Sequence, residues 1–302
     1  MRPNLFIVGA PKCGTTAWMR YLRSHPEIFF SPVKEPEYFA TDYDQARPVK
    51  SLREYMRLFE GVTSASVLGE ASSRYLISKS AAKNIGEFNP AARILIFLRD
   101  QEDYIPSLHN QLILSGQETM LDLEKAWSLS GERGPPTIIG STWEPWLFDY
   151  KLAGRFHEQV DRYFAEFPEQ QIRVFHFRDW SRNPRETYLE ILRFLGLADD
   201  GRLEFPKINE ASIHRSPRLA KIMANQSPPV RATARLIKLL IGQRGAWRLA
   251  KEVTRANARR GYATTVSDRM REEIRRYYAS ANARLEARIW KPAPAAEDQF
   301  AV

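Results

Sequence analysis

The feature that most constrains the fold is Leu5–Thr16, where a short apolar run leads into a loop with two glycines. The run Leu5–Gly9 (LFIVG) is continuous, apolar and ends at glycine, which is typical of a buried parallel strand. Thr15–Ser24 follows with apolar residues at helical spacing, which predicts a helix. Glycines let backbone N–H groups close around an anion, and the helix start adds the positive end of its dipole. This segment therefore predicts an α/β protein with an anion-binding loop.

Strands and helices alternate along the rest of the chain. The predicted strands are Val67–Gly69, Arg93–Leu98 and Gln171–Phe177, and the predicted helices are Leu52–Phe59, Ala82–Glu87, Tyr104–Ser115, Trp146–Phe167, Pro184–Leu195 and Ser267–Ile289. Alternation of this kind predicts a central parallel sheet between two layers of helices, a three-layer α/β/α fold. We expect one domain over residues 1–292 and a flexible tail at 293–302.

Composition excludes several other classes of protein. The 302 residues are 43% hydrophobic, which is enough for a full core. The single cysteine rules out an internal disulfide, and the five histidines have no HExxH-type spacing, so a metal-based mechanism is not expected. No apolar run approaches the roughly 20 residues of a membrane span, and no apolar stretch of a signal peptide precedes the first strand. The expected location is cytoplasmic.

Positive charge is concentrated late in the chain. The whole sequence carries +9, whereas residues 215–260 hold twelve Lys or Arg and one acid, Glu252, a net charge of +11. We expect a basic helical lobe here. It is either a solvated helical face or the partner of an anion: a nucleotide, an acidic substrate, an anionic membrane surface or nucleic acid. Nucleic acid is the weaker reading, because only Trp247 offers a ring for base stacking.

The loop differs from a nucleotide-binding P-loop, G-x-x-x-x-G-K-[ST], in one respect. Gly9 and Gly14 keep the glycine spacing and Thr16 supplies the hydroxyl, but Thr15 fills the lysine slot and Lys12 stands inside the loop. From there Lys12 would lie beside the first bridging oxygen of a shorter ligand rather than reach a γ-phosphate. The plain alternative is an ordinary strand–helix turn with an incidental lysine.

Two motifs carry a resemblance to a known family. FIVGAPKCGTTAWMRYLRSHPEI closely resembles the phosphosulfate-binding loop of the sulfotransferases that use 3′-phosphoadenosine 5′-phosphosulfate (PAPS), in which P-K-x-G-T-T follows a strand. ARILIFLRDQEDYIPSLHNQ is similar to their 3′-phosphate motif, a strand ending in Arg99 with Ser107 on the next helix. A softer similarity covers Trp146–Leu197. Both motifs follow strands, as a nucleotide at the carboxyl edge of a sheet requires.

The resemblance implies a P-loop-like fold and transfer of a sulfuryl group from PAPS to an acceptor, leaving PAP, with no metal required. Lys12 would stabilise the charge that builds on the bridging oxygen. The positions that the resemblance assigns to the nucleotide are Pro11, Lys12, Cys13, Gly14, Thr15 and Thr16 in the loop, Arg99 and Ser107 on the 3′-phosphate, and Arg260 and Gly261 in a basic loop above it. Cys13 would have a pKa lowered by its electropositive surroundings, and we assign it no catalytic role.

The general base has three candidates. Lys34-Glu35-Pro-Glu-Tyr-Phe resembles the E-x-x-F-F stretch of the glycan-modifying branch, whose first glutamate is the proposed base, so Glu35 comes first. Glu70 is second; in the glycan enzymes a lysine follows this position, whereas here Ala71 does. Lys34 or Arg74 would then supply the missing cation. His109 is third, and is more often a packing residue.

Two other functions and several acceptors stay open. One alternative is a P-loop kinase that uses ATP, with Asp100 at the end of a Walker B-like strand; the other is a non-catalytic protein that binds anions or membranes through residues 215–260. The loop Gly131–Pro145 and its neighbours Trp127, Trp143, Trp146 and Phe148 would line a partly apolar entrance. That entrance favours a hydroxyl on a lipid, glycolipid or natural product, whereas the +11 segment favours an anionic carbohydrate.

Overall fold

Five parallel strands form the centre of the molecule, in the order β2-β3-β1-β4-β5. They are β1 (Leu5–Gly9), β2 (Ile28–Phe30), β3 (Val67–Ala71), β4 (Arg93–Leu98) and β5 (Ile172–His176). In β1, Phe6 pairs with Glu70 of β3 on one side and with Ile94 of β4 on the other. All five residues of β1 are buried, which explains why its sequence is apolar without alternation.

The computed structural model describes residues 2–115, 117–118, 120–132, 148–208, 252 and 266–289, and the backbone of 212–214 and 258–260; the side chains of 44–46 are not described. The α-helices are α1 (Thr15–Arg23), α2 (Leu52–Arg57), α3 (Ala81–Phe88), α4 (Gln101–Leu114), α5 (Leu123–Ser128), α6 (Tyr150–Ala153), α7 (Phe156–Glu166), α8 (Phe177–Arg182), α9 (Pro184–Leu195) and α12 (Asp268–Ile289). Short 3-10 turns lie at Thr41–Ala46, Ser73–Tyr75 and Glu169–Gln171. A separate antiparallel pair joins β6 (Ser212–His214) to β7 (Ala258–Arg260), and β6 contacts α4.

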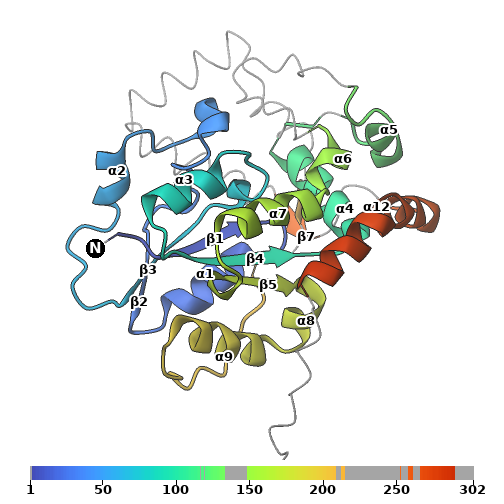
Figure 1. The fold of residues 1–302 in the computed structure, drawn as a ribbon. Coiled ribbons are helices and arrows are strands. Elements are labelled where there is room, and N and C mark those ends of the chain that lie inside the picture. Colours follow the sequence, from blue (N-terminus) through green and yellow to red (C-terminus); the bar gives the residue numbers. More distant parts are fainter. Residues whose placement is uncertain are drawn as a thin grey trace, which may run out of the picture.

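Helices cover both faces of the sheet, so the predicted three-layer α/β/α architecture is confirmed (Figure 1). α3 and α7 pack on one face, and α1, α8 and α9 lie on the other. α4 leaves the carboxyl end of β4, and α12, the red helix of Figure 1, crosses it and also packs on α7. The basic helical lobe and the tail predicted at 293–302 lie outside the described residues, apart from residue 252 and the backbone of β6 and β7. Within the described part of the chain, no helix is long and apolar enough to cross a membrane.

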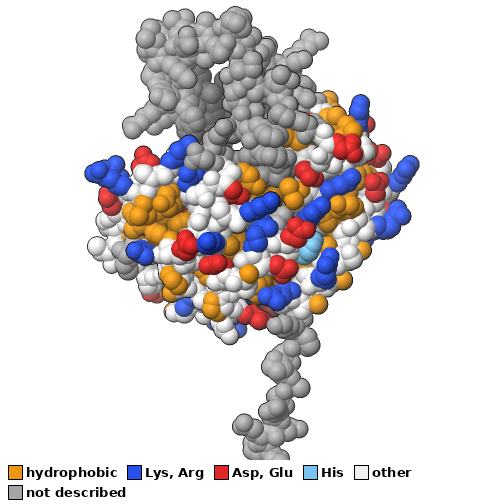
Figure 2. All heavy atoms as spheres, turned by 45° about the horizontal axis from the view of Figure 1, so that its top comes forward, with side chains coloured by type: hydrophobic (Ala, Val, Ile, Leu, Met, Phe, Trp, Pro, Cys, Tyr) orange, Lys and Arg blue, Asp and Glu red, His pale blue; other side chains and the backbone are white. Residues whose placement is uncertain are grey.

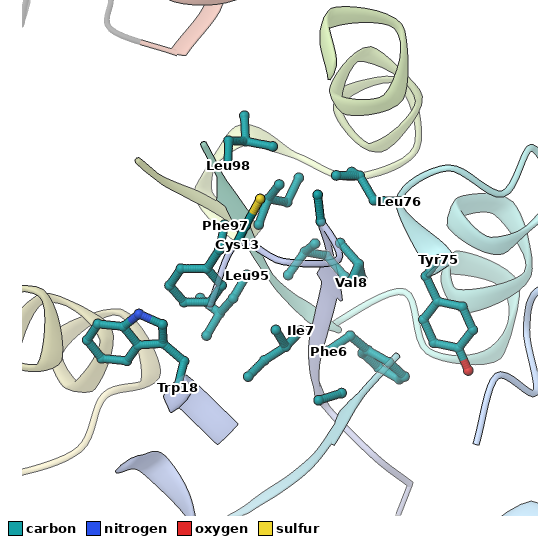
Figure 3. Packing of buried hydrophobic residues seen from close by; sticks show 14 of the residues in the cluster. Phe6, Ile7, Val8, Cys13, Trp18, Tyr75, Leu76, Leu95, Phe97 and Leu98 are labelled. Carbon is teal, nitrogen blue, oxygen red and sulfur yellow. The ribbon is translucent and has the colours of Figure 1, made fainter. Parts of the chain in front are cut away.

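The core gathers around β1 and the start of α1 (Figure 3). Trp18 of α1 stacks on Phe97 of β4 with ring centroids 5.4 Å apart and an interplanar angle of 9°. The edge of Trp180, from α8, meets Trp18 at 5.7 Å. These rings tie the helix after β1 and the helix after β5 to the strand between them, which fixes both beside the carboxyl edge of the sheet.

A proline inside α4 links that helix to the end of the chain. Pro106 has no N–H, so the carbonyl of Glu102 loses the partner that a regular helix would supply. Arg271 of α12 donates to that carbonyl at 3.2 Å and to the Asp103 carboxylate at 2.7 Å. α12 therefore completes the hydrogen bonding of a helix whose cleft face carries Ser107. The sequence prediction started this helix at Tyr104, whereas the structure starts it at Gln101.

The helix predicted over Trp146–Phe167 is wrong as one continuous element. Within its described part, α6 ends at Ala153 with Gly154 as its C-cap, and α7 begins at Phe156. The hydroxyl of Tyr278 in α12 donates to the carbonyls of Tyr150 and Lys151 at 2.9 and 3.0 Å, at the break. A Cβ at Gly154 would lie 2.4 Å from that hydroxyl, so the glycine both ends α6 and admits α12.

Gly14→Ala should destabilise the fold more than Gly61→Ala. Both glycines have positive φ, +95° and +76°, but a Cβ at Gly14 would lie 2.2 Å from Trp180 whereas Gly61 faces open space. Trp180 is held by Trp18 and Phe177, so it has little room to move. We expect a loss of about 1 kcal/mol at Gly61 and at least about 2 kcal/mol at Gly14, measured by urea unfolding. Equal losses would contradict this packing.

Candidate active site

A cleft of about 1160 Å³ opens where the strands end, above the anion-binding loop. Its walls come from the loop after β1, the loop after β2, the turn after β3, α4, α8 and residues 205–208. The described residues that line it are Pro11, Lys12, Gly14, Thr15, Thr16, Ala17, Tyr21, Lys34, Glu35, Ser73, Arg99, Ser107, Asn110, Gln111, Leu114, Phe177, Trp180, Ser181, Pro184, Phe205, Lys207 and Ile208. Most of the residues predicted to contact a nucleotide are thus brought together in one cleft.

The loop after β1 presents backbone donors and one ammonium group. Gly14 is the N-cap of α1, with φ +95°. It has no side chain that could accept a hydrogen bond from the first turn of the helix, so the N–H groups of Thr15 and Thr16 are available to a ligand. Lys12 also adopts a left-handed conformation, with φ +64°. A non-glycine residue there costs about 1 kcal/mol, and such strain is concentrated at functional sites.

Three cations face the cleft around the loop. Lys12 donates from Nζ to Oε1 of Gln111 at 3.1 Å. Burial lowers the pKa of Lys12 below its usual range, and the positive charges of Arg99 and Lys34 lower it further. Cations that repel one another in a partly buried space are stabilised by an anion. The electrostatics of the cleft therefore favour an anionic ligand over an empty site.

Arg99 and Ser107 lie on the same wall, as the sequence predicts. Arg99 follows β4 with its guanidinium over the ring of Phe177, 4.7 Å from the ring centroid, and its ionic contact with Asp103 is long, at 3.8 Å. Its Nε atom is buried and has no partner within the described residues. Ser107 lies on the cleft face of α4. Among the described residues, its hydroxyl has no hydrogen-bond partner. Together they offer a planar donor group and a hydroxyl, which suit a phosphate.

Glu35 lines the opposite side of the cleft. Its carboxylate accepts from the Ser73 backbone N–H at 2.7 Å and from the Ser73 hydroxyl at 3.1 and 3.2 Å, and it contacts the Lys34 ammonium. The backbone of Glu35 is left-handed, with φ +58°, and so is that of Glu37, with φ +54°. Glu37 is buried and receives a hydrogen bond from Arg74 at 2.7 Å. Arg74 is thus engaged with Glu37, whereas Lys34 lies in the cleft beside Glu35.

Glu70 lies behind the cleft wall, on β3, and is 1% exposed. Burial raises the pKa of Glu70 to about 8, against hydrogen bonds from Tyr75 and Ser72 that lower it. The negative charges of Glu35 and Glu37 raise this pKa too. A carboxyl with this pKa is mostly protonated near neutral pH, and Glu70 does not line the cleft, whereas Glu35 does.

His109 and Cys13 are placed in the core. His109 is fully buried, its Nε2 lies 2.8 Å from the carbonyl of Met120, and its ring edge meets Tyr150. Cys13 points into the apolar cluster beside Phe97 (Figure 3), and its N–H is bonded to the Ala10 carbonyl at 3.3 Å. The expectation of a lowered pKa for Cys13 is wrong, because burial raises it to about 12. Neither side chain lines the cleft.

The remaining predicted residues have mixed outcomes. Trp127 is buried under α12, where its indole donates to Glu273 at 2.9 Å, and Phe148 is buried too, so neither forms part of the cleft entrance. Trp143 and Trp146 lie outside the described residues, as does Gly261. Arg260 belongs to β7, and only its backbone is described. The ligand of the +11 segment stays a prediction; on the face seen in Figure 2, the described acidic and basic side chains are interspersed.

The structure adds cleft residues that sequence reasoning missed. Gln111 follows Ser107 by one turn of α4, and that spacing is the signal that could have found it. Trp180, Tyr21 and Phe205 form an aromatic wall, in which Tyr21 and Phe205 meet edge-on at 5.2 Å. Lys207 adds a fourth cation at this end. Segments distant in sequence supply the aromatic wall and Lys207, and no local pattern connects them.

A parallel sheet with this strand order and a glycine-rich loop at the start of a helix define a P-loop-like α/β protein, here with a cleft lined by cations. The sulfotransferase domain family matches residues 2–236, which is most of the chain. The chain therefore belongs to the sulfotransferase family.

Similar proteins include two human enzymes and one bacterial structure. Carbohydrate sulfotransferase 15 from Homo sapiens is 24% identical over 255 residues, covering 65% of this chain and 44% of that protein. Human heparan sulfate glucosamine 3-O-sulfotransferase 3B1 is 22% identical over 195 residues, covering 65% and 46%. This chain thus spans less than half the length of these curated relatives. The crystal structure of a sulfotransferase from Alicyclobacillus acidocaldarius superposes with a TM-score of 0.67 and 27% identity, over 96% of both chains.

Glu70→Gln should remove a pH dependence of stability. The folded-state pKa of about 8 lies above the roughly 4.3 of an unfolded glutamate, so the folded protein holds this proton more tightly. The stability that the proton contributes is complete below about pH 4.3 and is lost as pH rises toward 8, by up to about 1.4 kcal/mol per pH unit. Between pH 5.5 and pH 8, the urea midpoint of unfolding should therefore fall more in the wild type than in Glu70→Gln. Parallel curves would mean that Glu70 is ionised in the fold.

Proposed function

We propose that this protein transfers a sulfuryl group from PAPS to a hydroxyl group of an acceptor, releasing PAP. The observation that carries the proposal is one cleft in which Lys12, at the anion loop, lies between the Arg99–Ser107 pair and Glu35. A phosphate-binding pair, a cation for the leaving group and a carboxylate for the incoming group are the three parts that this reaction needs.

The donor would lie along the loop and α4. Its 5′-phosphosulfate would take the N–H groups of Thr15 and Thr16 together with the Lys12 ammonium. Its 3′-phosphate would accept hydrogen bonds from the Arg99 guanidinium and the Ser107 hydroxyl. Arg260 and Gly261 would also contact this phosphate. The aromatic wall of Trp180, Tyr21 and Phe205 offers ring faces and edges to a purine. The cleft volume of about 1160 Å³ exceeds what the nucleotide alone needs and leaves room for an acceptor.

The chemical step is a displacement at sulfur. The acceptor oxygen forms a bond to sulfur as the bond from sulfur to the bridging oxygen breaks, and the electron pair goes to PAP. Lys12 stabilises the negative charge that develops on that oxygen. Glu35 takes the hydroxyl proton, and Ser73 and Lys34 hold its carboxylate in place. Lys34, next to Glu35 in the cleft, is the described cation best placed to contact the sulfuryl oxygens in place of the lysine that Ala71 replaces.

A carbohydrate is the acceptor class that we favour. The human relatives are named as a carbohydrate sulfotransferase and a heparan sulfate glucosamine 3-O-sulfotransferase. A lipid or natural product would need an apolar entrance to the cleft. Trp127 and Phe148, two of the residues expected to form that entrance, are buried away from the cleft. The +11 segment at residues 215–260 suits an anionic carbohydrate.

The kinase alternative loses its main residue. Asp100 accepts from Arg178 at 2.6 Å and lies 3.3 Å from Nε2 of His176, so it holds α8 to the end of β4. These partners lower the pKa of Asp100 to about 2. Calorimetric titration with PAP and with ATP plus Mg²⁺ tests the choice: we expect PAP to bind and ATP to bind far more weakly. The reverse order would overturn the proposal.

Arg99→Ala should weaken PAP binding by at least about tenfold, because a charge-assisted pair contributes about 1.5–3 kcal/mol. Binding of adenosine 5′-phosphosulfate, which lacks the 3′-phosphate, should change little. Arg93→Ala is the matched control, since Arg93 stands at the other end of β4 over the ring of Phe194. Calorimetry with both ligands measures the difference. Equal losses for both ligands in Arg99→Ala would remove the 3′-phosphate role.

Glu35→Gln should abolish sulfuryl transfer while PAP affinity stays within about twofold. Gln retains a carbonyl oxygen for the Ser73 N–H but cannot take a proton at neutral pH. Glu70→Gln is the comparison, because that carboxyl is already protonated behind the wall and should retain most of the turnover. Turnover of labelled PAPS with a carbohydrate acceptor is the measurement. Full activity in Glu35→Gln with loss in Glu70→Gln would reverse the assignment.

A further inference from the structure

One contact in the cleft joins the anion loop to the helix on the other side of it. Nζ of Lys12 donates to Oε1 of Gln111 at 3.1 Å, between residues that are 99 positions apart in the sequence. Gln111 lies on α4 one turn after Ser107, and both line the cleft. The bond therefore spans the cleft between the loop after β1 and the wall that carries the predicted 3′-phosphate residues.

The charged groups around Lys12 explain what this bond does. The charged and titratable groups that act on its ammonium are Arg99 at the end of β4, Lys34 after β2 and the neighbouring Cys13 thiol, which is buried and protonated. Two of these groups are cations that repel the ammonium. Among the described residues, the amide oxygen of Gln111 is the acceptor that holds it in the cleft. That oxygen is neutral, so it does so without a negative charge that would repel an anionic ligand.

We propose that Gln111 is a positioning residue for Lys12, whose amide oxygen holds the ammonium across the mouth of the anion loop until an anionic ligand oxygen replaces it. This inference rests on the proposed function for the identity of the ligand, whereas the contact itself is a feature of the fold. A bond from an ammonium to an anionic oxygen is stronger than one to an amide, so the exchange proceeds when the ligand arrives. The left-handed backbone of Lys12 sets the direction in which its side chain leaves the loop. The hydrogen bond to Gln111 then holds the ammonium group at the end of that side chain.

Removal of the acceptor has a defined electrostatic effect. A hydrogen bond to the ammonium favours the charged form, whereas burial and the repulsion by Arg99 and Lys34 favour the neutral amine. Without the Gln111 oxygen, the balance moves further toward the neutral amine. The fraction of reactive amine at a fixed pH rises, and affinity for an anion begins to fall at a lower pH.

A ligand-free experiment tests the contact directly. The purified protein is labelled at pH 8 with an amine-acylating reagent, and the modification of Lys12 is measured by mass spectrometry in the wild type and in Gln111→Leu. Gln117→Leu is the matched control, because Gln117 follows α4, is bonded to Ser115 and does not line the cleft. We expect labelling of Lys12 to rise severalfold in Gln111→Leu, because the amine loses the acceptor that favours its charged form, and to stay unchanged in Gln117→Leu. Unchanged labelling in Gln111→Leu would overturn the proposal.

A binding experiment separates this inference from the proposed function. PAP affinity is measured by calorimetry from pH 6.5 to 9.5, and its decline in Gln111→Leu should begin at a lower pH than in the wild type. Gln111→Glu should restore slow labelling of Lys12 but weaken PAP binding, because a carboxylate would face the anion. If the wild type does not bind PAP, the proposed function fails while the labelling result still decides the role of Gln111. A wild-type pH profile in Gln111→Leu, with PAP bound, would reject the positioning role alone.

Discussion

The pairing of β1 with both β3 and β4 is the constraint on which the site depends. β1 pairs in parallel with β3 on one side and with β4 on the other, so all three strands end at the same edge of the sheet. Lys12, Ser73 and Arg99 therefore reach the same edge from three separate parts of the sequence. A continuous buried apolar strand is thus what converts distant motifs into neighbours.

The carboxyl edge of the sheet combines backbone strain with a concentration of charged groups. Lys12, Glu35 and Glu37 all have left-handed backbones, a conformation that non-glycine residues avoid, and all three carry ionisable groups at or next to the cleft. Folding must offset both the strain and the repulsion among the cations, and the aromatic cluster around Trp18 and the neighbouring core contribute to that. Fixed charges held in place by the fold are the arrangement that electrostatic catalysis requires.

The sequence predicts the framework better than it predicts the depth of individual side chains. Leu5–Gly9 has the predicted bounds, because an apolar run between a polar start and a glycine has few alternatives. Arg99 and Ser107 reach one wall because strand ends share an edge. By contrast, the local pattern ranked Glu35 above Glu70 without showing the depth of either side chain, and only packing shows that Glu70 lies behind the wall. Gln111 meets Lys12 through tertiary contact alone, so its partner could not be read from its neighbours.

The bond from Arg271 to the Glu102 carbonyl has a consequence for how the molecule is made. Its two ends lie 169 residues apart, and the earlier one belongs to the helix that carries Ser107. During synthesis from the N-terminus, that helix emerges from the ribosome with an unpaired carbonyl, because Pro106 offers no donor. That carbonyl gains its protein donor, Arg271, only after α12 has been made. The helix that carries Ser107 therefore reaches its full hydrogen bonding only after the chain has been made as far as Arg271.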